Sequence, residues 1–88
     1  MDDDDAILTF PCEFPIKIVG LTGDTFEIAA LSIIRTYFPE IKQDSLKTRT
    51  SKEGKYLAIT VIVTATSQAQ LDAVYQALTD SPDIVMAL

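Results

Sequence analysis

The chain of 88 residues is long enough for one domain, and its hydrophobic content of 48% can supply a small core. Its formal charge of −6 comes mostly from Asp2–Asp5, which leave only −2 on the remaining residues, so the composition argues against a nucleic-acid-binding protein. No apolar run approaches the roughly 18 residues of a membrane span, and the start MDDDD is unlike a secretory signal, so we expect a cytoplasmic protein.

Four adjacent aspartates repel one another and bury nothing. We therefore expect residues 1–8 to be a solvated, disordered acidic tail, with a metal-binding cluster as the less favoured alternative, and residues 9–88 to form a single domain. The one cysteine, Cys12, cannot form an internal disulfide. A small buried hydrophobe is favoured for it over a reactive thiol, because Lys17 is the only basic residue close to it in sequence.

The first predicted strand covers residues 14–20, FPIKIVG, where apolar residues alternate with residues that suit an exposed face. A helix should follow, with Asp24 as its N-cap and Glu27 at the spacing of a capping box. Apolar residues then recur on one helix face, and Pro39 ends the helix because it disfavours helical geometry at the residue before it.

Residues 45–66 read as a hairpin, because a polar arm and an apolar alternating arm flank the turn sequence KEGK. The polar arm is typical of an edge strand and the apolar arm of a central one. Ser67 and Gln70 repeat the capping spacing and predict a second helix, whose apolar stripe is narrow. The apolar segment 83–88, DIVMAL, predicts a short closing strand.

The predicted order is β-α-β-β-α-β, the ferredoxin-like arrangement of the α+β class. Two helices should cover one face of a four-stranded antiparallel sheet, and right-handed crossovers give the strand order 4-1-3-2. Enzymes, metal carriers, RNA-binding proteins and regulatory modules all use this architecture, so the fold by itself does not give the function.

The chain lacks the residues that several function classes of this fold require. The chain has no histidine to serve as a catalytic base, and no asparagine for an acylphosphatase-type site. A metal carrier would show a C-x-x-C pair, but Cys12 stands alone. RNA recognition needs several aromatic side chains on the open sheet face, and Tyr56 is a single one. We therefore expect no catalytic residues, no metal, no cofactor and no nucleic-acid partner.

The segment GLTGDT holds the candidate ligand site. A helix N-terminus preceded by small, flexible residues is a natural anion site, because its N–H groups are free. Asp24 would occupy these donors and repel anions, which favours a purely structural entry to the helix and leaves open a neutral or amino-bearing ligand. The candidate ligand-binding residues are Gly20, Leu21, Thr22, Gly23 and Asp24.

Two further surfaces could bind proteins. Ile28 and Leu31 project opposite the core stripe of the first helix and could support self-association, or could be ordinary surface residues. An acidic protein partner could bind the open sheet face or the basic hairpin. The open face carries Lys17, Val19, Tyr56, Thr60 and Ile62, and the hairpin carries Lys47, Arg49, Lys52 and Lys55.

Three segments, FPCEFPIKIVG, SKEGKYLAITVIVTATS and SPDIVMAL, together resemble the bacterial YbeD-like family of small uncharacterised proteins, also called DUF493 or UPF0250. The resemblance covers roughly residues 9 to 88. It implies a ferredoxin-like fold similar to ACT-type regulatory domains and a role linked to lipoate metabolism, but no catalytic residues. The matching positions are Phe10, Pro11, Cys12, Phe14, Pro15, Lys17, Gly20, Ser51, Gly54 and Tyr56.

Most of these matching positions have structural reasons, since prolines stiffen the entry to the first strand and Gly54 permits the hairpin turn. Lys17 is the least explained. The leading hypothesis is a non-enzymatic regulatory or sensor-like module, whose small-molecule effector binds residues 20–24, completed by a second copy of the chain. The alternative is a protein-interaction adaptor without a small ligand, and an enzyme is the remaining hypothesis.

Overall fold

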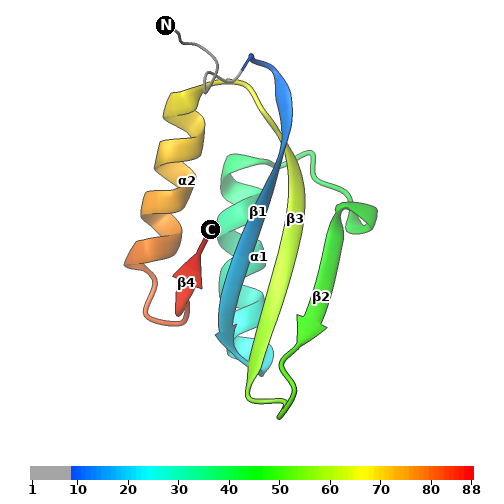
Figure 1. Ribbon diagram of the computed structural model, residues 1–88. Helices are drawn as coiled ribbons and strands as arrows, with labels where there is room; N and C mark the ends of the chain where they lie inside the picture. Colours follow the sequence, from blue (N-terminus) through cyan, green and yellow to red (C-terminus); the bar gives the residue numbers. More distant parts are fainter. Residues whose placement is uncertain (1–8) are drawn as a thin grey trace, which may run out of the picture.

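Strands and helices follow one another in the order that the sequence predicts, β-α-β-β-α-β (Figure 1). The computed structural model describes residues 9–88, and the expected acidic tail, residues 1–8, lies outside the described residues. The elements are β1 (Cys12–Leu21), α1 (Asp24–Tyr37), a 3-10 turn (Gln43–Ser45), β2 (Leu46–Thr50), β3 (Tyr56–Ala65), α2 (Gln68–Asp80) and β4 (Met86–Ala87).

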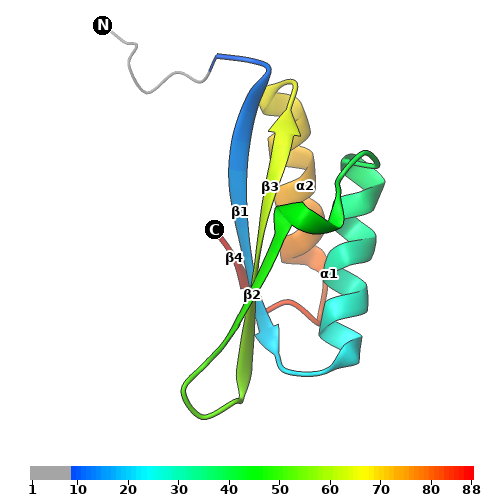
Figure 2. The ribbon, with the colours of Figure 1, turned by 90° about the vertical axis from the view of Figure 1, so that its right-hand side faces the viewer.

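The strands form one antiparallel sheet in the order β2-β3-β1-β4, which is the predicted order read from the other edge. β1 and β3 are its long central pair, from Cys12 opposite Ala65 to Leu21 opposite Tyr56. Both helices lie on the same side of this sheet, and its other face is open (Figure 2). The chain therefore has the predicted ferredoxin-like fold.

The core lies between the sheet and the two helices. Alternate residues of β1 and β3 point into it, as the period of two in the sequence predicts. Each helix contributes one apolar stripe at helical spacing. The buried residues are Ile16, Ile18, Phe26, Ala30, Ile34, Phe38, Leu57, Ile59, Val61, Val63, Ala65, Leu71, Val74, Leu78 and Ile84.

The second helix begins at the predicted N-cap. The Ser67 hydroxyl accepts a hydrogen bond from the Gln70 N–H at 3.1 Å. The Gln70 side chain does not return to Ser67: its amide oxygen accepts from the Thr66 N–H at 2.8 Å, and its amide nitrogen donates to the Tyr37 carbonyl oxygen at 3.1 Å. Gln70 therefore links the start of α2 to the end of α1.

β4 is shorter than the predicted closing strand, because only two of its residues form ladder pairs with β1. Its pairing is extended by Leu88, whose N–H donates to the Lys17 carbonyl oxygen at 2.8 Å and whose carbonyl oxygen accepts from the Lys17 N–H at 2.9 Å. In an antiparallel sheet, successive residues of a strand direct their backbone N–H and C=O groups alternately toward the strand on one side and the strand on the other side. The odd-numbered residues of β1, Pro15 included, therefore direct their backbone groups toward the β4 side.

Candidate functional site

The five candidate ligand residues, Gly20–Asp24, here called the turn site, run from the end of β1 through the turn to the first residue of α1. Gly20 is buried against Phe26, and a methyl group added at Gly20 would overlap the Phe26 ring. Gly23 has φ 148°, a backbone conformation that favours glycine, and no atom lies within 4 Å of the position a Cβ would take. The Thr22 N–H donates to the Lys55 carbonyl oxygen at 2.9 Å, so the hairpin holds this turn in place.

The predicted capping box at α1 is wrong. Gly23 is the N-cap residue, and no side-chain capping hydrogen bond is formed there. A capping side chain must belong to the non-helical residue that precedes the first turn. Gly23 holds that position without a side chain, and Asp24 is already the first helical residue. The N–H groups at the start of α1 therefore receive no bond from a capping side chain.

The open face of the sheet carries a shallow hollow of about 430 Å³, here called the sheet-face hollow. The strand register explains it: Val19 and Arg49 both lie beside Ala58, whose side chain is short. None of the lining residues is acidic. They are Lys17, Val19, Arg49, Thr50, Ser51, Lys52, Tyr56 and Ala58.

This hollow brings together two surfaces that the sequence treats separately. Lys17 and Tyr56 come from the predicted open face, whereas Arg49 and Lys52 come from the basic hairpin. Thr60 lies beside them, because it pairs with Lys17 on one side and with Lys47 on the other. The Lys55 ammonium lies 5.5 Å from the centre of the Tyr56 ring. The part of the open face around this hollow therefore presents a cationic surface with one aromatic ring.

Ile28 and Leu31 lie together on the outer surface of α1, here called the helix face. They line a hollow of about 500 Å³ with Ser32, Arg35 and Thr36. Ile28 is 68% exposed, as expected, while Leu31 is only half-buried rather than fully exposed. The helix face therefore combines apolar contact area with one positive charge.

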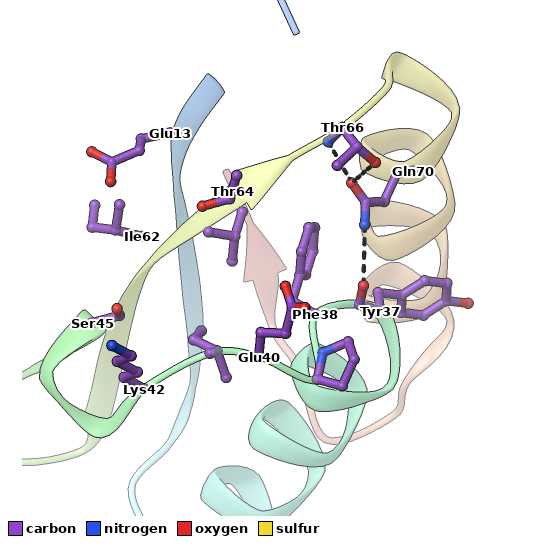
Figure 3. Close-up of a pocket in the computed structure, with 13 residues that line it drawn as sticks. Glu13, Tyr37, Phe38, Glu40, Lys42, Ser45, Ile62, Thr64, Thr66 and Gln70 are labelled. Atoms are coloured by element: carbon purple, nitrogen blue, oxygen red, sulfur yellow. Dashed lines mark hydrogen bonds between the residues drawn. The ribbon is translucent and has the colours of Figure 1, made fainter. Parts of the chain in front are cut away.

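A fourth site, which the sequence analysis missed, lies where β3 extends beyond β2. β2 pairs with β3 only as far as Val61, and the next three residues of β3, 62–64, line a hollow of about 480 Å³ together with Ser45 of the 3-10 turn before β2. Figure 3 shows this strand-end hollow between the end of β3, the loop after α1 and Gln70. Its lining residues are Glu13, Tyr37, Phe38, Pro39, Glu40, Ile41, Lys42, Ser45, Ile62, Val63, Thr64, Thr66 and Gln70.

The remaining chemistry of the described residues is modest. Cys12 is a free, partly buried thiol. Within residues 9–88, no group of three or more His, Cys, Asp or Glu side chains could hold a metal ion, and no helix has the length and apolar character needed to cross a membrane. Burial raises the pKa of Tyr75, whose ring meets the Phe14 ring edge-on with centroids 6.5 Å apart.

Comparison with known families gives one match over nearly the whole chain. The family described as "Protein of unknown function (DUF493)" matches residues 5–88. A UPF0250 protein of Nitrosomonas europaea is 42% identical over 85 residues, which cover 97% of this chain and 98% of the relative. A UPF0250 protein of Chromobacterium violaceum is 38% identical over 87 residues, which cover 99% of this chain and 98% of the relative.

Two solved structures share the fold. The solution structure of a protein from H. pylori has a TM-score of 0.73 at 19% identity and covers 100% of this chain and 94% of that one. The ACT domain from the GTP pyrophosphokinase of Chlorobium tepidum has a TM-score of 0.65 at 12% identity and covers 88% of this chain and 97% of that one. At these identities the likeness is one of fold.

Proposed function

We propose that this chain, which belongs to the DUF493 family, is a non-catalytic regulatory module of the cytoplasm. It binds a small-molecule effector at the turn site. The observation that carries the proposal is the uncapped start of α1. Its first N–H groups have no capping side chain, and helix N-termini with free donors attract acceptor groups of ligands.

The residues around the turn indicate what kind of effector fits. Asp24 places a carboxylate beside the helix donors, so a purely anionic ligand would be repelled. An effector that carries both a hydrogen-bond acceptor and an amino group fits this site. Its acceptor would bind the N–H groups of the helix, and its amino group would bind the Asp24 carboxylate. Leu21, which is 54% exposed, offers apolar contact next to them. An amino acid has this combination of groups.

The likeness to an ACT domain supports a regulatory role. The matched ACT domain comes from a GTP pyrophosphokinase, so this fold serves there as one domain of an enzyme. By analogy, we propose that effector binding changes the association of this chain with another protein. The link to lipoate metabolism remains a hypothesis from the family resemblance, and it adds lipoate and octanoate derivatives to the compounds to be tested.

A thermal-shift screen of the purified full chain tests the proposal. Amino acids, lipoate and octanoate derivatives, and nucleotides are added singly, because a ligand at 100 times its Kd stabilises the native state by about 2.7 kcal/mol. We expect at least one compound to raise the Tm of the wild type and of Gly54→Ala, but not of Gly23→Ala. Both glycines have positive φ and open space around them, which makes Gly54 a matched control.

Each ligand-induced shift is measured against the ligand-free Tm of the same variant, so that backbone strain cancels. A compound that stabilises Gly23→Ala as strongly as the wild type would place its binding elsewhere. A screen in which no compound raises the wild-type Tm would contradict the sensor function.

The adaptor function is the second candidate, and the sheet-face hollow favours it. Its cationic side chains come from β1 and from the hairpin, and no acidic residue lines it. An acidic protein surface would complement it. In that case Lys17→Glu would abolish capture of an acidic partner while leaving the turn-site ligand response unchanged. Lys42→Glu, which makes the same charge change outside this hollow, would retain capture.

A further inference from the structure

The open face of the sheet carries most of the large apolar side chains that are exposed among residues 9–88. Both helices lie on the other side of the sheet, so neither covers this face (Figure 2). Of seven such side chains, only Ile28 and Val85 lie elsewhere. Single exposed apolar residues need no explanation, but a group of them on one face indicates an interaction surface. The group is Leu21, Tyr56, Ile62, Met86 and Leu88.

The strand register arranges the side chains of this face in rows across the sheet. Val19 pairs with Met86 of β4 on one side and with Ala58 of β3 on the other. Ala58 in turn pairs with Arg49 of β2. Residues that pair directly across a sheet direct their side chains to the same face. This row therefore runs from the apolar Met86 to the cationic Arg49.

The neighbouring row has the same polarity. Lys17 exchanges two backbone hydrogen bonds with Leu88, and it pairs with Thr60, which pairs with Lys47. Ala87, between the two rows, pairs with Ile18 and packs against the core, which agrees with Met86 and Leu88 pointing to the open face. The second row therefore also begins with an apolar residue at β4 and ends with a cation at β2.

The two rows make the open face amphipathic, with its apolar part toward β4 and its basic part toward β2. Glu13 lies farther along β1, opposite Thr64, and Glu53 lies in the hairpin turn, and neither lines the sheet-face hollow. The surface, here called the amphipathic face, consists of Lys17, Val19, Leu21, Lys47, Arg49, Tyr56, Ala58, Thr60, Met86 and Leu88.

The backbone of the sheet indicates what form of partner fits this face. The N–H and C=O groups of paired strands bond one another in the plane of the sheet, so the face offers side chains alone. An extended segment laid flat on it would bury backbone groups without partners, which is costly. An α-helix bonds its own backbone groups internally, so it can cover the face without this cost.

We propose that the amphipathic face binds an amphipathic acidic helix of a partner protein. This inference rests on the adaptor function proposed above and adds the form of the partner. The apolar stripe of the helix covers Val19, Tyr56 and Met86, while carboxylates on one flank of the stripe meet Lys47 and Arg49. An anionic membrane would act on the whole chain, whose net charge is −6, whereas a single helix meets only this face.

The test uses the full chain labelled with nitrogen-15 and a helical peptide of about 15 residues, close to the shortest that forms a helix alone. The peptide is acetyl-Ser-Glu-Glu-Leu-Ala-Glu-Leu-Leu-Glu-Ala-Leu-Glu-Glu-Ala-Leu-amide, which places its leucines on one face. We expect saturable shifts of the amide resonances of residues 17–21, 47–49, 56–60 and 86–88. Circular dichroism should show that the helix content of the peptide rises on binding.

Two control peptides separate helix from charge. Proline in place of the second alanine breaks the helix without changing the leucines or the charge, and should weaken binding at least about tenfold. Lysine in place of every glutamate reverses the charge and should abolish binding.

Three protein variants locate the contacts. Lys47→Gln should weaken binding about threefold, while Lys42→Gln, the same charge change outside the amphipathic face, should leave the affinity unchanged. Met86→Gln removes apolar contact at an exposed position and should also weaken binding about threefold.

Equal affinity of the proline peptide would overturn the helix and leave the adaptor function standing, since an acidic partner would still bind. Equal affinity of the lysine peptide would overturn both proposals. Absence of any shift at millimolar peptide, or shifts confined to the helices, would overturn the amphipathic face as the binding surface. If the chain instead cosediments with vesicles of phosphatidylglycerol and phosphatidylcholine, the face binds a membrane and the proposal is wrong.

Discussion

Gly20 lies in β1 directly beneath the ring of Phe26, which leaves no room for a side chain. We predict that Gly20→Ala lowers the free energy of unfolding by about 1–3 kcal/mol, because the buried ring must shift to admit the methyl group. Urea denaturation measures this change. In a Phe26→Leu background the overlap is smaller, so the same substitution should cost less. An equal cost in both backgrounds would refute the explanation.

The two helices begin in different ways, and their stabilities should respond differently. The Ser67 hydroxyl accepts the Gln70 N–H at α2, whereas Asp24 forms no capping bond at α1. We predict that Ser67→Ala lowers the free energy of unfolding by about 0.5–2 kcal/mol. Asp24→Ala should cost less, because only the favourable interaction of its charge with the helix dipole is lost. A larger loss for Asp24→Ala in urea denaturation would contradict this account.

The elements were predictable because each depends on local patterns. Alternation in residues 14–20 gave the first strand, and the spacing of Ser67 and Gln70 gave the start of α2. The capping box at Asp24 has the same spacing but fails, since Gly23 already holds the N-cap position. Spacing alone does not show which residue is the last non-helical one.

The sites depended on information that a local pattern does not contain. The sheet-face hollow requires the register that places Val19 and Arg49 beside Ala58. The strand-end hollow requires β2 to be five residues long and β3 ten. One signal was available: the apolar alternation of the second hairpin arm continues to Ala65, well beyond the length of the polar arm.

At the scale of the whole molecule, the helix face is the surface that we propose for self-association. Ile28 and Leu31 lie on α1, which covers the side of the sheet opposite its open face (Figure 2). We propose that two copies associate there and predict that Leu31→Asp shifts the protein to monomer in sedimentation equilibrium. Gln76→Asp, an exposed change of the same charge on α2, should leave the association intact. A wild type that is monomeric throughout, or a Leu31→Asp dimer, would contradict this prediction.

Because of Pro15, the two outer sides of the β1–β3 pair differ in their backbone N–H donors. Its backbone points to the β4 side beyond the pair of Lys17 and Leu88, but a proline has no donor for an incoming strand. On the opposite flank, Thr64 lies beyond the last pair of β2 with β3 and is not a proline, so its backbone keeps a donor. Fibre growth by repeated strand addition requires each molecule to accept a strand on both flanks. Because Pro15 leaves one flank without this donor, repeated strand addition into an open-ended polymer is disfavoured.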